Sequence, residues 1–121
     1  RRITGEYHIS DDDVKNGTVQ PDSVCRVTFG VDIHEPMEKK QTCWGHPAFD
    51  IPLRAMVPLK VENLMTAGRC ISGSFYAHAS YRVTGNCLAM GEGAGKAAAE
   101  AISKRKTIRQ YAVLLKKITQ S

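Results

Sequence analysis

Asn63-Leu-Met-Thr-Ala-Gly-Arg-Cys-Ile-Ser72, followed by Tyr81-Arg-Val-Thr-Gly-Asn-Cys-Leu-Ala-Met-Gly-Glu-Gly-Ala-Gly-Lys-Ala-Ala-Ala99, carries the clearest structural signal of the chain. Residues 64–67 predict a short buried strand that ends at Gly68, and residues 86 to about 103 predict a helix rich in glycine and alanine. Such a helix can lie very close to another backbone. Its amino end carries free N–H groups and the positive end of the helix dipole, which favour a negative or electron-rich partner. This layout is typical of one half of a cofactor site.

The glycines of the predicted helix carry an energetic cost. Glycine within a helix is about 1 kcal/mol less favourable than alanine, so the glycines between residues 91 and 95 together require packing that offsets about 3 kcal/mol. Packing of the helix on a sheet is one explanation. A cofactor edge at the helix start, where Gly85, Asn86 and Cys87 would leave backbone N–H groups free, is another. The sequence leaves both explanations open.

The rest of the chain predicts an α+β fold with a small antiparallel or mixed sheet. Residues 1–9, 23–29 and 31–33 alternate in the manner of strands, and residues 49–57 predict one strand or two short ones. The strand at residues 64–67 and the glycine-rich helix would then form a separate carboxyl-terminal part.

Two further helices are expected, one near the start of the chain and one at its end, and a loop is expected ahead of the glycine-rich helix. Ser10 or Asp11 can cap a single helical turn that Gly17 ends. Residues 75–80 predict a loop, and Thr107 caps a last amphipathic helix. The apolar stripe of this last helix consists of Ile108, Tyr111, Leu115 and Ile118.

Composition indicates a globular protein. The 121 residues are 42% hydrophobic and 24% charged, and no apolar run approaches the roughly 20 residues that a membrane span needs. The formal charge of +5 is concentrated in residues 96–117, and with 7% aromatic residues it predicts a solvated helix face rather than a nucleic-acid site. We therefore expect neither a membrane nor a nucleic-acid partner. Because the first residue is Arg1 rather than Met, we expect the chain to be cut from a longer protein.

The four cysteines are scattered and form no Cys-x-x-Cys pair. This pattern favours a reducing cytoplasm in which the thiols act as small core residues. A zinc site formed by Cys25, His34, Cys43 and His46 is an alternative. Because the spacing of these four residues is irregular, we predict no metal.

Arginine and histidine side chains are the main candidates for catalysis. Arg82, just ahead of the predicted helix, and Arg69, just after the predicted strand, could each face a ligand or pair with a surface carboxylate. Asp32 and His34 would share one face of a strand, and a histidine oriented by a carboxylate can act as an acid or base near neutral pH. Arg54 could bind a substrate carboxylate or only brace its loop.

Several motifs in order resemble one family. The chain resembles the carboxyl-terminal end of bacterial FAD-dependent oxidoreductases of the glutathione-reductase-like superfamily, in the branch related to fumarate reductase flavoproteins. Besides the opening stretch, the motifs are Gly5-Glu-Tyr7, Val31-Asp-Ile-His-Glu-Pro36, Ile51-Pro-Leu-Arg-Ala-Met-Val-Pro58, Ala79-Ser-Tyr-Arg-Val83 and Gly91-Glu-Gly-Ala-Gly-Lys-Ala-Ala-Ala99.

The resemblance implies a division of the chain and a set of site residues. Residues 1–60 would be part of a substrate-facing sheet domain, and residues 61–121 would be the carboxyl-terminal portion of an FAD-binding domain. Arg82 would lie at the interface of substrate and flavin, and the start of the helix would offer N–H groups to the pyrimidine end of the flavin. The cofactor-binding residues that the resemblance implies are Ala67, Gly68, Arg69, Gly85, Asn86 and Cys87.

The chain departs from the family in one important respect. It contains no Gly-x-Gly-x-x-Gly motif after a strand, so the turn that holds the cofactor phosphates is missing. The expected function is therefore that of a carboxyl-terminal fragment of an FAD-dependent oxidoreductase, which caps the flavin, contributes to the substrate site for hydride transfer and is inactive alone. The expected partners are the missing amino-terminal half, a small-molecule substrate and, through an exposed apolar face, other copies of the fragment. The alternative is a non-catalytic module that docks through the glycine-rich helix.

Overall fold

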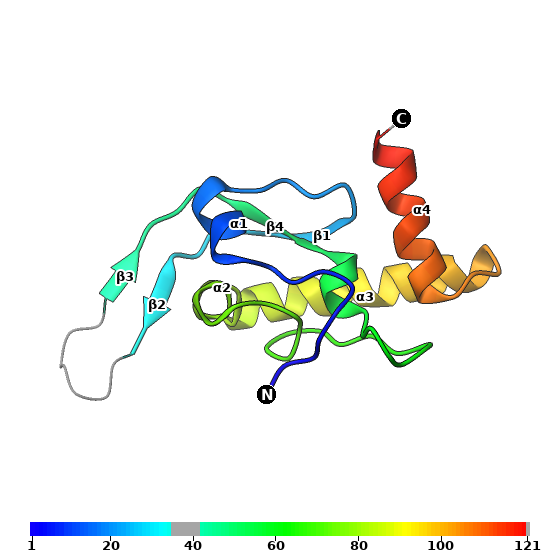
Figure 1. Ribbon diagram of the computed structural model, residues 1–121, viewed down its shortest axis with the longest axis horizontal. Helices are drawn as coiled ribbons and strands as arrows, with labels where there is room; N and C mark the ends of the chain where they lie inside the picture. The colour runs from blue at the N-terminus through cyan, green and yellow to red at the C-terminus, as the bar shows by residue number, and fades with distance from the viewer. Residues whose placement is uncertain (35–41, 121) are drawn as a thin grey trace.

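The computed structural model describes residues 1–34 and 42–120, with only the backbone of residues 42–44. Within these residues the chain forms an α+β fold, as the sequence predicts (Figure 1). The strands are β1 (Ser23–Val27), β2 (Val31–Ile33), β3 (Thr42–Trp44) and β4 (Phe49–Pro52). The helices are α1 (Asp11–Asn16), α2 (Phe75–Tyr81), α3 (Thr84–Ser103) and α4 (Ile108–Gln120), with a 3-10 helix η1 (Leu53–Met56).

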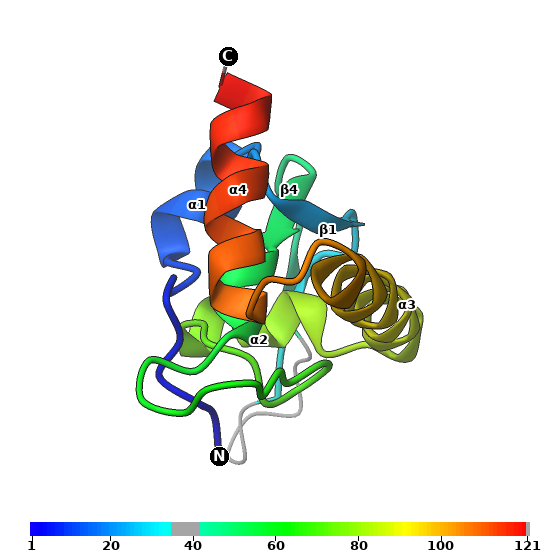
Figure 2. The ribbon, with the colours of Figure 1, turned by 90° about the vertical axis from the view of Figure 1, so that its right-hand side faces the viewer.

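The strands form two small antiparallel sheets rather than one. β1 pairs with β4, with Val27 opposite Phe49, and β2 pairs with β3. The β1–β4 pair lies between α1 on one side and α3 on the other (Figure 2). Val27, Phe49 and Ile51 are fully buried there, together with Met90 from α3. This layer forms the centre of the hydrophobic core.

The glycine-rich helix α3 packs on β1 through one of its glycines. A Cβ atom on Gly93 would lie 2.8 Å from Val24 Cβ and 3.2 Å from the Val24 carbonyl oxygen, so only glycine fits without a shift. By contrast, no heavy atom of the described residues beyond the neighbouring backbone lies within 4 Å of a Cβ placed on Gly91 or Gly95. Sheet packing therefore accounts for one of the three glycines, and the other two lie on an open helix face.

The caps predicted for the first and last helices are confirmed. Ser10 accepts a hydrogen bond from the Asp13 N–H while the Asp13 carboxylate accepts one from the Ser10 N–H, and Gly17 ends α1 in the left-handed conformation with φ 62°. At α4, the Gln110 N–H donates to Thr107 Oγ1 and the Thr107 N–H donates to Gln110 Oε1. Both helices begin with the reciprocal pattern of a capping box.

Three predicted strands differ from the structure. Residues 1–9 form only isolated bridges, from Gly5 to Pro58 and from Ile9 to Gly73, in place of a strand. The strand expected over residues 49–57 ends at Pro52, because the Asp22 carboxylate accepts a hydrogen bond from the Arg54 N–H and the chain bends into η1.

The strand expected over residues 64–67 is also wrong. These residues are not in a strand, Leu64 is 46% exposed, and the Thr66 N–H donates to the Met56 carbonyl oxygen. A strand needs a neighbour along its backbone, and none of the described strands lies beside this segment. The apolar character of the segment reflects partial burial of Met65 instead.

Helix α2 replaces the loop expected over residues 75–80. Ser74 caps the helix by accepting a hydrogen bond from the Ala77 N–H, and Ala77, Ala79 and Tyr81 are buried. Hydrogen bonds also join the two parts of the chain on either side of residue 60, since the Ile3 N–H donates to the Cys70 carbonyl oxygen. In the part of the chain that the structure describes, no helix has both the length and the apolar character needed to cross a bilayer.

Candidate functional site

A polar cleft of about 400 Å³ opens where β2, α2 and the start of α3 meet the turn at residues 67–69. It brings together three residues that the sequence predicts as site residues: His34, Arg69 and Arg82. They come from segments far apart in sequence, so the fold alone makes them neighbours. The charged and polar residues that line the cleft are Asp32, His34, Arg69, His78, Arg82 and Thr84.

The predicted pair of Asp32 and His34 forms as expected. Both residues lie on one face at the β2 end, and His34 Nε2 is 3.2 Å from Asp32 Oδ2. The Asp32 side chain is largely buried, while that of His34 is 61% exposed. The carboxylate can therefore orient an imidazole that remains accessible from the cleft.

Arg82 follows α2 and is fixed at the wall of the cleft. Its Nη2 donates a hydrogen bond to the backbone carbonyl oxygen of Asp32 at 3.0 Å. Among the described residues no acceptor engages its other guanidinium nitrogens, and none engages Arg69, which is exposed. The cleft thus contains two arginines with donors available to a ligand.

His78 is a cleft residue that sequence reasoning missed. It has no acidic neighbour in sequence, and its place became visible only once residues 75–81 formed a helix that carries it one turn before Arg82. Its ring meets the Tyr81 ring edge-on, with centroids 5.6 Å apart. Burial lowers the pKa of His78, and the positive charges of Arg2 and Arg82 lower it further. The imidazole is therefore neutral at pH 7. Ser74, a helix-capping residue ahead of this segment, is the signal that could have found it.

The start of α3 lies beside the cleft and presents backbone donors. The Cys87 N–H donates to the Val83 carbonyl oxygen, so it is not free, contrary to the prediction. The free donors are instead the N–H groups of Thr84, Gly85 and Asn86, for which no acceptor exists among the described residues. A Cβ on Gly85 would meet no heavy atom within 4 Å in this part of the chain, so the approach to these donors is open.

The turn at residues 67–69 packs against this helix start. Gly68 has φ 86°, and a Cβ placed on it would lie 3.5 Å from Cys87 Sγ. Ala67 and Arg69 flank Gly68 and are exposed. The side chain of Asn86 donates to the Ser80 carbonyl oxygen at 3.5 Å, which ties α3 to α2. An electron-rich ring edge at this place would meet three N–H donors and the positive end of a 20-residue helix. The described residues fit the edge of a flavin but include no turn for its phosphates.

Arg54 lies outside the cleft. Its Nε and Nη2 each lie 3.0 Å from an oxygen of the Asp22 carboxylate, Nη2 also donates to Gln20 Oε1, and its guanidinium stacks over the Tyr7 ring at 4.9 Å. Asp22 is almost completely buried. Arg54 therefore braces the fold, which is the second of the two roles that the sequence left open.

The zinc alternative does not match the geometry of the described residues. His46 Nε2 lies 2.9 Å from Ser80 Oγ and 2.7 Å from the Phe29 carbonyl oxygen, and its Nδ1 lies 2.7 Å from the Pro47 carbonyl oxygen. Cys25 is buried on β1. No group of three or more His, Cys, Asp and Glu residues suited to a metal occurs within residues 1–34 and 45–120, and the side chain of Cys43 lies outside the described residues.

Comparisons with known proteins identify one family. The family model of FAD-dependent oxidoreductases matches residues 1–120. No curated protein and no solved structure matches the chain. The family match agrees with the cofactor that the resemblance of the motifs implies.

Proposed function

The chain belongs to the FAD-dependent oxidoreductase family, and on this premise we propose that it is the carboxyl-terminal portion of such an enzyme, which caps the flavin and lines the substrate site for hydride transfer. One observation carries the proposal. Thr84, the first residue of α3, lines the same cleft as Arg82, and the free N–H groups of residues 84–86 lie beside the Gly68 turn, where an added Cβ would be 3.5 Å from Cys87 Sγ. Residues 67–69 and 84–86 would contact the flavin, and the adjoining cleft would receive the substrate.

The chemistry of the proposed site divides between cofactor and protein. FAD, when bound, supplies the two-electron acceptor for a hydride. The N–H groups of Thr84, Gly85 and Asn86 would stabilise negative charge on the nearest flavin edge, because fixed donors need no reorganisation when charge develops. Arg82, held by the Asp32 carbonyl oxygen, would orient the substrate. The neutral imidazole of His78 can accept a proton at its unprotonated ring nitrogen.

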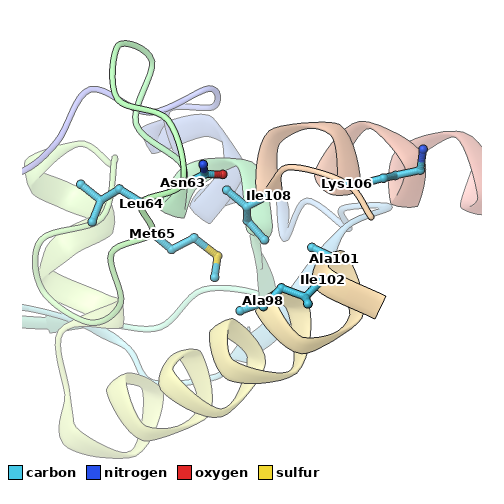
Figure 3. Close-up of a pocket in the computed structure, with 8 residues that line it drawn as sticks. All are labelled: Asn63, Leu64, Met65, Ala98, Ala101, Ile102, Lys106 and Ile108. Atoms are coloured by element: carbon cyan, nitrogen blue, oxygen red, sulfur yellow. The ribbon is translucent and has the colours of Figure 1, made fainter. Parts of the chain in front are cut away.

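The open face of α3 supports the proposal that another part of the same protein packs there. Leu88 and Ile102 are 71% and 77% exposed, and Gly91 and Gly95 lie on an open helix face. At the far end of α3 an apolar groove of about 380 Å³ runs between the helix and residues 63–65, with Met65 directed toward α3 (Figure 3). The amino-terminal half of an FAD-binding domain would cover these surfaces and supply the missing phosphate-binding turn. Without it, the chain is expected to self-associate.

The first experiment compares the chain alone with a longer protein that includes the encoded region upstream of Arg1. The longer protein is expected to bind FAD, measured as flavin absorbance that remains after gel filtration, and the chain alone is expected to bind it weakly or not at all. A longer protein that contains no flavin and takes none up would overturn the proposal.

A second experiment tests the place of the flavin. The Gly85→Ala substitution adds a methyl group where the described residues leave open space, and alanine is about 1 kcal/mol better than glycine within a helix. The isolated variant is therefore expected to fold with equal or higher stability, whereas the longer protein with the same substitution is expected to lose FAD affinity, because the methyl group would meet the flavin. The matched control is Gly45→Ala, also open and outside the cleft. Equal FAD affinity in both variants would remove the start of α3 from the cofactor site.

The second candidate function is a non-catalytic docking module, favoured by the open face at Gly91 and Gly95. It predicts a partner on α3 but no flavin. An upstream region that encodes a strand followed by Gly-x-Gly-x-x-Gly favours the enzyme, whereas an upstream region without this motif favours the module.

A further inference from the structure

We propose that Cys25 and Cys87 are a site of reversible oxidation, at which the two thiols form a disulfide bond between β1 and the start of α3. The described cysteines Cys25, Cys70 and Cys87 are free thiols in the structure, so the bond is a modification of this state. The reaction uses a peroxide and no flavin, and it goes beyond the proposed hydride transfer.

The two thiols lie on segments that contact each other. Cys25 Sγ lies 4.0 Å from the Asn86 carbonyl oxygen, which belongs to the peptide group that joins Asn86 to Cys87. A carbonyl oxygen lies about 2.8 Å from the next Cα atom across a trans peptide, so Cys25 Sγ is within about 7 Å of the Cys87 Cα atom. In a disulfide each sulfur lies about 4 Å from the partner's Cα atom, so the Cys25 sulfur has at most about 3 Å to travel.

The backbones of α3 and β1 also approach each other closely beside this pair. A Cβ on Gly93 would lie 3.2 Å from the carbonyl oxygen of Val24, the residue before Cys25 on β1. The electrostatics agree with this proximity: burial raises the pKa of the Cys25 thiol, and the charges of Asp50 and Cys87 raise it further. The two thiols are therefore neighbours across the interface between helix and sheet.

The two cysteines differ in access, which sets the order of the steps. Cys25 is 7% exposed, whereas Cys87 is partly exposed, so a peroxide meets Cys87 first. The Cys87 thiolate sulfur attacks the O–O bond of hydrogen peroxide, which gives a sulfenic acid and one water. The Cys25 thiolate then attacks the sulfenic sulfur, the S–S bond forms, and the sulfenic oxygen leaves as a second water. In total the two thiols lose two electrons and two protons, and the peroxide is reduced to water.

The disulfide changes the contacts at the start of α3. In the free thiol state, Cys87 donates to the Arg82 carbonyl oxygen at 3.5 Å, and its sulfur lies 3.5 Å from the place of a Cβ on Gly68. A disulfide sulfur has no hydrogen to donate, and the position of the Cys87 side chain is then set by Cys25. Under the proposed function residues 67–69 contact the flavin, so oxidation would loosen the cofactor there. Only this consequence rests on the proposed function.

The experiment oxidises the 121-residue chain with a small excess of hydrogen peroxide and maps the disulfides by mass spectrometry after tryptic digestion without reductant. Trypsin cleaves after lysine and arginine, so the four cysteines fall on four different peptides, residues 16–26, 41–54, 70–82 and 83–96. The folded chain is expected to give mainly the linked peptides 16–26 and 83–96, which dithiothreitol separates.

Oxidation of the unfolded chain is the control for chance pairing. A longer loop costs more entropy to close. In concentrated guanidinium chloride, the pair Cys70 and Cys87, 17 residues apart, should therefore form in preference to the pair Cys25 and Cys87, 62 residues apart, by about sevenfold. The opposite preference in the folded chain would show that the fold selects the pair.

Variants separate the two steps. Cys25→Ala leaves Cys87 without its partner, so the Cys87 sulfenic acid should persist and be trapped by dimedone on the peptide of residues 83–96. Cys87→Ala should give no dimedone adduct on the peptide of residues 16–26, because Cys25 is buried. Cys70→Ala is the matched control, since it retains both reacting thiols, and it should form the disulfide as the parent chain does.

Three outcomes would overturn the proposal: the same disulfide pattern in the folded and the unfolded chain, Cys70–Cys87 as the main bond of the folded chain, or oxidation of Cys87 that reaches only sulfinic or sulfonic acid. The proposed function fails separately, because disulfide mapping uses no flavin. FAD uptake by the longer protein with no Cys25–Cys87 bond in the folded chain refutes only this inference. The bond without FAD uptake refutes only the flavin assignment.

Discussion

Arg54 and Arg82 are both candidate ligand-binding arginines in the sequence, and the structure gives them opposite surroundings. Arg54 directs its donors to the buried carboxylate of Asp22 and to Gln20, and it stacks on Tyr7. Within the described residues Arg82 donates one hydrogen bond, to the Asp32 carbonyl oxygen, and it lines the cleft. A guanidinium whose donors are satisfied inside the molecule stabilises the fold, whereas one with donors left over can bind a ligand. Whether the hydrogen-bond donors of a side chain have acceptors inside the molecule therefore distinguishes structural residues from candidate ligand-binding residues.

The largest effect is expected for Arg54, the arginine whose donors are satisfied inside the molecule. Arg54→Met should destabilise the chain by about 3–5 kcal/mol, because it leaves the Asp22 carboxylate, whose side chain is 0% exposed, without its charge partner. Urea unfolding followed by circular dichroism measures the loss. Arg69→Met is the matched control and should change stability by less than about 0.5 kcal/mol. Similar losses in the two variants would contradict the distinction.

Arg82→Gln should affect function far more than folding. In the flavin-containing protein we expect flavin reduction to slow by about a hundredfold, the usual effect of removing one charge-stabilising donor, with a smaller loss of FAD affinity. The isolated variant should lose about 1 kcal/mol or less, the value of one hydrogen bond. Stopped-flow absorbance and flavin titration separate the two effects. Unchanged reduction kinetics would remove Arg82 from the site.

Two glycines of α3 allow the same comparison between the face of the helix that packs on β1 and the face that is open. Gly93→Ala should cost about 1–3 kcal/mol, because the added methyl group would collide with Val24 on β1. Gly95→Ala should stabilise the isolated chain by about 1 kcal/mol, since nothing in the described chain occupies the space. Thermal unfolding of both variants checks the sign. If Gly95→Ala weakens association with the upstream region, then the open face is the one that the partner half covers.

The smallest effect concerns His78 and pH. Because its pKa is lowered in the folded chain, the unfolded chain binds the proton first as the pH falls. The contribution of His78 to the free energy of unfolding is therefore fully present above the pKa of the unfolded chain, about 6.5, and it is lost as the pH falls through the lower pKa of the folded chain. His78→Gln should therefore remove a small decrease in stability below about pH 6.5. In NMR titrations, Arg82→Gln should move the His78 pKa up toward its usual value, and an unmoved pKa would contradict the contact.

Local signals predicted the elements that local interactions determine. Ser10 and Gly17 delimit α1 as the sequence indicates, and Thr107 begins α4. The spacing of Asp32 and His34 predicted that their side chains meet, because alternate residues of a strand share a face. The family followed from ordered motifs, and the family match confirms it at the level of FAD-dependent oxidoreductases.

Elements that depend on distant partners were not predictable in this way. Residues 64–67 are apolar enough for a strand but have no strand beside them among the described residues. The bend into η1 depends on Asp22, about thirty residues earlier in the chain. Helix α2 was missed, and with it His78, because its short apolar run gave no clear period.

By itself, the sequence determined the helix caps, the glycine-rich helix and the family, because these depend on neighbouring residues and on ordered motifs. Only the tertiary structure decided that the guanidinium donors of Arg54 have acceptors inside the molecule and that those of Arg82 are available to a ligand. Only the tertiary structure brought together the residues of the cleft, among them His34, Arg69, His78 and Arg82. The physical reason is that hydrogen-bond satisfaction and burial depend on partners far away in the sequence, and their positions follow from packing the whole chain.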